Sequence, residues 1–90
     1  YLVNDCQFYI GSAGGNQLEI QDKTVSREHA IILESIRIDG SEGYTIQDMN
    51  STNGTWINDK KMRKGSQAKL KDGTIIRFAQ KEYKFLLQDI

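Results

Sequence analysis

Residues 44–58 read YTIQDMNSTNGTWIN, in which a polar loop separates two short alternating runs. Alternation of apolar and polar residues is typical of strands, so Tyr44–Asp48 and Thr55–Asn58 are predicted to be strands. The five small residues Ser51–Thr55 cannot build a core, but they can expose hydroxyls, an amide and backbone N–H groups. The Asn-Gly pair within them is a strong turn signal, because both residue types tolerate positive φ. The stretch is therefore interpreted either as a plain hairpin turn or as a binding loop at a sheet edge.

Strand-like runs separated by turn residues recur along the rest of the chain. Further strands are predicted at residues 1–3, 7–10, 18–20, 29–34, 68–70, 74–78 and 83–87, and turns or loops at 4–5, 11–16, 21–24, 39–43, 59–61 and 65–66. Asp72-Gly73 is predicted to form a hairpin between the strands on either side. A helix over residues 26–33 is the alternative at one place, but the isoleucines there favour a strand. The pattern predicts an all-β sandwich or barrel.

Composition narrows the classes of function. The 90 residues are expected to form one domain, residues 1–90, cut from a longer protein. Lys plus Arg and Asp plus Glu number 12 each, so the charge balance gives no sign of a nucleic acid or a membrane as partner. Cys6 is the single cysteine, and with one histidine it does not support a zinc site, so no metal or other cofactor is expected. A chain without disulfides is expected in the nucleus or the cytoplasm.

Two loops carry polar groups that could contact the same ligand. One offers Ser26 and Arg27, and the other offers Ser51, Thr52 and Asn53. Together they supply hydroxyl donors, backbone N–H groups and one guanidinium, which suit a doubly negative tetrahedral anion such as a phosphate. Loops at the end of a sandwich are held rigidly by the sheets, which makes them suitable for binding.

With these motifs in order, the chain resembles a forkhead-associated (FHA) domain. The resemblance rests on Gly11, on residues 26–30 (SREHA) and on residues 51–58 (STNGTWIN), and residues 70–76 resemble the penultimate hairpin of that family. It implies a β-sandwich of two antiparallel or mixed sheets, related to the SMAD fold, with binding loops at one end. It also implies recognition of phosphothreonine peptides in signalling, with a phosphothreonine-containing protein as the partner.

The resemblance assigns a role to each matching residue. Ser26 and Thr52 would donate to the phosphate, Arg27 would contribute its backbone N–H and its side chain, and Asn53 would hold the peptide backbone beside the phosphothreonine. Structural support would come from the remaining matched positions, namely Gly11, His29, Gly54 and Thr55.

Ser12 departs from the family pattern, in which an arginine usually follows the matched glycine. An arginine contact to phosphate is worth about 1.5–3 kcal/mol, so its loss should weaken binding by roughly 10- to 100-fold. Arg27 or Lys23 could compensate, and Ser12 itself could make a weak contact. The alternative is a phosphate-independent or intramolecular docking domain on the same fold.

Three other features of the sequence have simpler interpretations. Ser26, His29 and Asp48 are the residue types of a hydrolytic triad, but their spacing does not orient an imidazole onto the hydroxyl, so no enzyme is expected. Trp56 is interpreted as packing against the sheet edge rather than stacking on nucleic acid. The basic run over residues 60–64 is interpreted as a solvated face.

Overall fold

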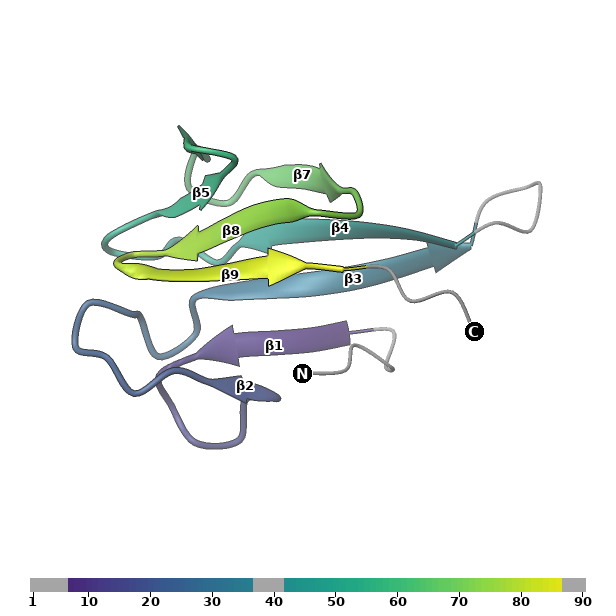
Figure 1. Ribbon diagram of the computed structural model, residues 1–90. Helices are drawn as coiled ribbons and strands as arrows, with labels where there is room; N and C mark the ends of the chain where they lie inside the picture. The colour runs from purple at the N-terminus through teal and green to yellow at the C-terminus, as the bar shows by residue number, and fades with distance from the viewer. Residues whose placement is uncertain (1–6, 37–41, 87–90) are drawn as a thin grey trace.

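The computed structural model describes residues 7–36 and 42–86 and arranges them in two β-sheets (Figure 1). Sheet A has five strands in the order β2-β1-β3-β4-β7, and sheet B has four in the order β6-β5-β8-β9. The strands are β1 Gln7–Gly11, β2 Leu18–Glu19, β3 Ala30–Ile36, β4 Glu42–Asp48, β5 Thr55–Ile57, β6 Lys60–Lys61, β7 Gln67–Leu70, β8 Thr74–Phe78 and β9 Lys81–Phe85.

The predicted sandwich of antiparallel or mixed sheets is confirmed. β1 and β2 pair in parallel, whereas the remaining strand pairs are antiparallel, so sheet A is mixed. The described residues contain no helix, and therefore none long and apolar enough to cross a membrane. The alternative of a helix over residues 26–33 is wrong, because β3 begins at Ala30 and its residues pair with β1 and β4. The strand predicted at residues 1–3, the turn at 4–5, Cys6 and most of the turn at 39–43 lie outside the described residues.

Two predicted hairpin turns connect the sheets instead of neighbouring strands. The Ser51–Thr55 stretch leads from β4 in sheet A to β5 in sheet B, and Asp72-Gly73 leads from β7 in sheet A to β8 in sheet B. The tight turn itself is present, since Gly73 has φ 84° and Thr74 N donates to Lys71 O at 3.1 Å. Only the inferred pairing is wrong, because β8 is already paired on both sides, by β5 and β9.

A hairpin forms where the sequence predicted a turn one residue later. Asn58 and Asp59 have φ of 47° and 67°, and they join β5 directly to β6 through the pair Ile57 and Lys60. Positive φ at both central residues matches the right-handed twist of the flanking strands.

The hydrophobic core lies between the two sheets. Sheet A contributes Phe8, Ile10, Leu18, Ala30, Ile32, Ile46 and Leu70, and sheet B contributes Ile76, Phe78 and Phe85. Ala30 and Ile32 of β3 belong to this core cluster, and Ile31 between them is buried outside the cluster.

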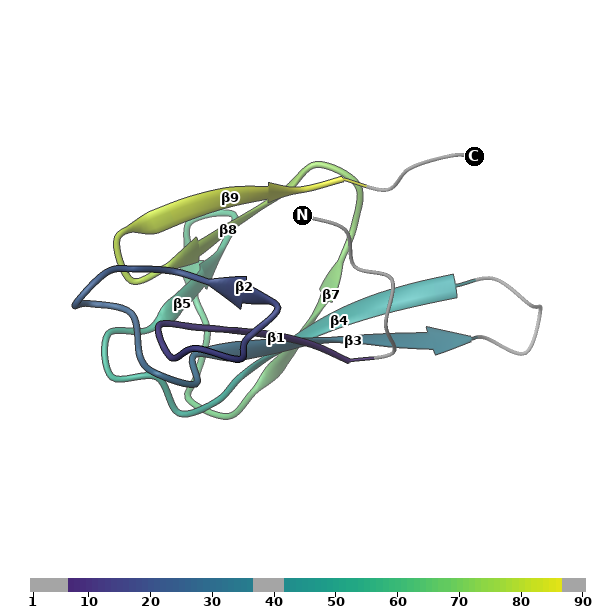
Figure 2. The same cartoon turned by 90° about the horizontal axis from the view of Figure 1, so that it is seen from below.

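Three connections collect at one end of the sandwich, where Figures 1 and 2 both show the β2–β3, β4–β5 and β8–β9 connections side by side. The start of the β1–β2 loop reaches the same end, since Ser12 N donates to Ser26 O at 3.0 Å. The core therefore fixes the strands from which four separate loops leave in the same direction.

Candidate functional site

His29 joins the two loops that the sequence singled out. Its side chain is completely buried, and its Nδ1 accepts a hydrogen bond from Ser26 N at 3.1 Å. Its Nε2 therefore carries the proton and donates to Gly54 O at 2.8 Å. The ring also meets Phe78 edge to face, with centroids 5.6 Å apart. Burial lowers the pKa of this imidazole, although the hydrogen bond to Gly54 and the Asp48 charge act in the opposite direction. A neutral ring thus holds the Ser26 loop against the Gly54 turn.

Asp48 holds the second loop from inside. Its buried carboxylate accepts hydrogen bonds from Ser51 N (3.2 Å), from Ser51 Oγ (2.5 Å), from Thr55 Oγ1 (2.8 Å) and from Gly65 N (3.3 Å). Burial raises the pKa of Asp48, but the hydrogen bonds from Ser51 and Thr55 outweigh it and hold the pKa below its usual value. Ser51 is fully buried, so its hydroxyl faces Asp48 and is not one of the exposed donors that the sequence suggested.

The two loops meet through Ser26 and Thr52. Thr52 N donates to Ser26 Oγ at 3.0 Å, and Asn53 Nδ2 donates to Thr24 O at 2.7 Å. Thr52 and Asn53 are exposed and Ser26 is half-buried, so two hydroxyls and an amide share one surface. The Ser26 hydroxyl accepts from Thr52, which leaves its own hydrogen for another acceptor. The Asn53 amide likewise keeps one of its two hydrogens.

Gly11 allows the β1–β2 loop to lie against the Ser26 loop. A Cβ at Gly11 would fall 2.0 Å from Arg27 O, so only glycine fits there. Next to it, Ala13 N and Asn16 Nδ2 both donate to Arg27 O, at 3.3 and 3.0 Å. The backbone of Arg27 is thus fixed through its carbonyl, and among the described residues no acceptor takes its N–H. Its side chain is exposed.

The predicted site residues therefore divide by position. Ser12, Ser26, Arg27, Thr52 and Asn53 lie together on the loop end, whereas His29, Gly54 and Thr55 lie beneath it. Sequence reasoning missed Asp48 as the support of the second loop. A signal was present, because an aspartate just before a turn commonly accepts hydrogen bonds from backbone N–H groups of that turn.

The residues of a hydrolytic triad do not assemble. His29 faces the backbone N–H of Ser26 rather than its hydroxyl, and the oxygens of Asp48 are occupied by the Ser51–Thr55 loop and Gly65. Within residues 7–36 and 42–86, no group of three His, Cys, Asp or Glu side chains could hold a metal ion. What the loop end offers is a set of fixed hydrogen-bond donors.

Fixed hydrogen-bond donors at the loop end of a two-sheet sandwich form a site that is suited to binding an anion. The model of the FHA domain family matches residues 8–79, which is most of the chain. The chain belongs to the FHA domain family. Members of this family are protein-interaction modules known for phosphopeptide-mediated contacts.

The chain is similar to several known proteins. It is 37% identical to the protein Germ layers disorganized gldi-3 of Caenorhabditis elegans, over 88% of this chain and 8% of that protein. It superposes on EmbR of Mycobacterium tuberculosis, solved in complex with a low-affinity phosphopeptide, with a TM-score of 0.79 and 28% identity, over 93% of this chain and 20% of EmbR. An FHA domain from a study of phosphothreonine-dependent interactions gives a TM-score of 0.82 at 30% identity, covering 100% of this chain and 85% of that one. The chain spans less than a fifth of the curated relatives it matches.

Proposed function

We propose that this domain recognises phosphothreonine in a partner protein and so mediates phosphorylation-dependent interactions, as a signalling module of the nucleus or the cytoplasm. The observation that carries the proposal is the 3.0 Å contact between Thr52 N and Ser26 Oγ, which places both hydroxyls and the Asn53 amide on one exposed surface. Binding is an equilibrium event, and no chemical step is part of it.

The phosphate would rest against the hydroxyls of Ser26 and Thr52 and the backbone N–H of Arg27. These groups are preorganised, because the buried His29 and Asp48 fix the loops before a ligand arrives. Preorganised donors lose little conformational entropy on binding, which favours affinity. Asn53 would use its remaining N–H and its carbonyl to hold the peptide backbone beside the phosphothreonine.

Positive charge at this site comes from exposed side chains. Arg27 and Lys23 are both exposed, whereas Ser12 supplies only neutral groups. A site with few fixed cations is expected to bind phosphate more weakly than one with a guanidinium at position 12. The second candidate function, a phosphate-independent or intramolecular docking domain on the same fold, is favoured by this one observation.

The proposal is tested by fluorescence anisotropy with a labelled peptide in phosphothreonine, phosphoserine and unphosphorylated forms. We expect binding to require the phosphate. Ser26→Ala and Asn53→Ala should each weaken binding by about tenfold or more, and Ser12→Arg should strengthen it by about tenfold. Ser66→Ala is the matched control, since its hydroxyl bonds Arg63 O on the β6–β7 connection. Circular dichroism would verify that each variant is folded.

Two outcomes separate the candidates. Equal affinity for phosphorylated and plain peptides, even with Ser12→Arg, would contradict phosphate recognition and favour phosphate-independent docking. Loss of binding in Ser66→Ala as large as that in Ser26→Ala would show that the peptide does not use the loop end.

A further inference from the structure

A second feature lies on the outer face of sheet B. Trp56 on β5 is paired across the sheet with Lys61 on β6 and with Arg77 on β8. Lys61 Nζ lies 5.4 Å from the centroid of the indole ring, and the guanidinium carbon of Arg77 lies 3.9 Å from it. We call Lys61, Trp56 and Arg77 the basic-aromatic face. Trp56 therefore packs beside the edge strand β6, as the sequence suggested, and also against Arg77 on the inner strand β8.

The total charge of the chain is zero, but acidic and basic residues are distributed unevenly along the sequence. Residues 1–55 contain three Lys or Arg and eight Asp or Glu, whereas residues 56–90 contain nine and four. Seven of these nine cations lie on or next to sheet B, whereas Lys69 and Lys71 lie on and just after β7 of sheet A. Glu82 on β9 is paired with Arg77 and is the acidic neighbour of the basic-aromatic face. Of the seven cations, Lys60, Lys61, Arg63, Lys64 and Lys84 are exposed. A local field of this sign attracts anionic segments even when the whole chain is neutral.

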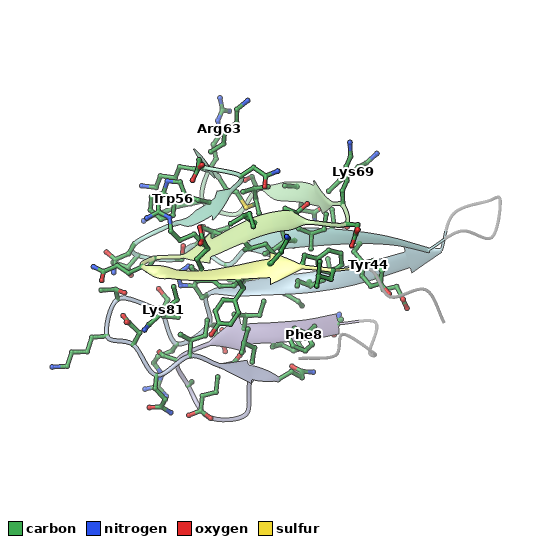
Figure 3. The ribbon with its side chains drawn as sticks, in the orientation of Figure 1. Phe8, Tyr44, Trp56, Arg63, Lys69 and Lys81 are labelled. Carbon is green, nitrogen blue, oxygen red and sulfur yellow. The ribbon has the colours of Figure 1, made fainter. Side chains whose placement is uncertain are left out.

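This face is continuous with the loop-end site through Gly54. A Cβ at Gly54 would lie 2.7 Å from Lys61 Cε and 3.1 Å from the rim of the Trp56 ring. Gly54 directly follows Asn53, which lies at the edge of the loop-end surface. Figure 3 shows Trp56 on the outer side of sheet B, above the loop end near Lys81 and away from Lys69 on β7. An extended peptide advances about 3.3 Å per residue, so a few residues carry it from Asn53 onto the face.

The chemistry of the face favours carboxylates over nucleotide bases. Arg77 already covers the indole ring at 3.9 Å, so Trp56 serves as a support for the cation and not as an open stacking platform. Trp56 is itself half-buried, and the described aromatic that is well exposed, Tyr9, lies on sheet A. A guanidinium held in place presents a planar fork of N–H donors, which matches a carboxylate.

We propose that the basic-aromatic face docks an acidic segment of the same partner that presents the phosphothreonine. This inference rests on the proposed function, and it adds that acidic residues lie about three to six residues from the phosphothreonine, on the side of the peptide that passes Asn53. Contacts between the acidic segment and the cations of the face would add to the affinity that is lost because Ser12 makes no charged contact with the phosphate. These added contacts lie away from the phosphate itself.

The test compares three labelled peptides with an identical phosphothreonine core, carrying four glutamates three residues before it, four glutamates three residues after it, or four glutamines at both places. We expect one of the glutamate peptides to bind about three- to tenfold more tightly than the glutamine peptide at low salt, with the gain lost at high salt. The gain should vanish in the double variant Lys61→Gln/Arg77→Gln. The control is Lys69→Gln/Lys71→Gln, which removes the same charge from β7 of sheet A and the residue that follows it, and which should keep the gain.

The outcomes distinguish this inference from the proposed function. Equal binding of all three phosphopeptides would overturn the docking face and leave phosphothreonine recognition intact. An equal loss in both double variants would overturn it as well, because it would show only general attraction by charge. Binding of none of the phosphopeptides, with the folded state verified, would overturn both. A single-stranded oligonucleotide that binds through Lys61 and Arg77, without any gain from glutamate, would assign the face to nucleic acid instead.

Discussion

The loop end and the outer face of sheet B both present groups suited to an anion, but they are built in opposite ways. At the loop end, neutral donors are fixed by buried side chains, chiefly His29 and Asp48. On the outer face, the cations of Lys61 and Arg77 lie over one indole ring. Buried hydrogen bonds are costly to break, whereas exposed charge contacts contribute little to stability. The loop end is therefore expected to tolerate substitution poorly, and the outer face to tolerate it well.

Asp48→Ala is expected to lower the free energy of unfolding more than any other substitution considered in either region. The substitution leaves Ser51 N, Ser51 Oγ and Thr55 Oγ1 without their buried acceptor, and the free energy of unfolding should fall by about 3 kcal/mol. Urea unfolding followed by circular dichroism measures the change. Glu82→Ala on the exposed side of β9 is the control and should change stability by less than about 0.5 kcal/mol. A loss below about 1 kcal/mol for Asp48→Ala would mean that the buried network does not hold the loop.

A somewhat smaller effect is expected from Gly11→Ala. The new methyl group would meet Arg27 O, a backbone atom that cannot turn away, so the Ser26 loop must shift. We expect a loss of about 1–3 kcal/mol in the free energy of unfolding. Gly14→Ala is a matched control, because a Cβ there meets nothing within 4 Å. Thermal melts of the two variants should differ clearly, and equal melting temperatures would contradict the close approach of the two loops.

A change of pH should act on the loop end through His29. Burial holds the pKa of its imidazole below the ordinary value of 6.5, so the unfolded chain binds a proton first as the pH falls. The contribution of His29 to stability should be complete above pH 6.5 and decrease as the pH falls from there towards the folded pKa. Urea unfolding between about pH 7.5 and 5.5 measures the slope. In His29→Gln this slope should disappear, and an unchanged slope in that variant would assign the effect to other groups.

The smallest effect is expected on the outer face. Arg77→Gln removes the closer of the two cations from Trp56, and exposed cation–π contacts contribute about 0.5–1 kcal/mol. The free energy of unfolding should therefore fall by no more than about 1 kcal/mol. A loss as large as that of Asp48→Ala would remove the contrast between the two regions, because it would show that the outer face contributes as much to stability as the loop end.

Local sequence patterns predicted the strands well and their partners less well. The alternation in Tyr44–Asp48 marks β4 and its inward Ile46, because the side-chain period of a strand is a local property. The turn at Asp72-Gly73 is equally local, but the sequence does not encode there that β7 pairs with β4 and β8 with β5. Pairing depends on the whole sandwich, so a turn signal cannot distinguish a hairpin from a connection between sheets.

The candidate site shows the same division. Motif spacing placed Ser26, Thr52 and Asn53 on one surface, and they do lie together there. The orientation of neighbouring side chains was not predictable, because Ser51 and Thr52 are adjacent hydroxyl residues of which one is buried and the other exposed. The charge separation between the two halves of the chain could have been counted from the sequence. That the positive charge gathers around one tryptophan could not be predicted, because only the strand register shows that Lys61, Trp56 and Arg77 are neighbours.

Backbone atoms supply a further part of the frame of the loop end. Ser12 N binds Ser26 O, Arg27 O is held from the β1–β2 loop, and Met49 N binds His29 O at 2.9 Å. None of these bonds depends on which side chain stands at positions 12 or 27. Geometry and specificity can therefore be inherited separately, so that a lineage could gain or lose an arginine at position 12 and retune its partners while the loops keep their shape.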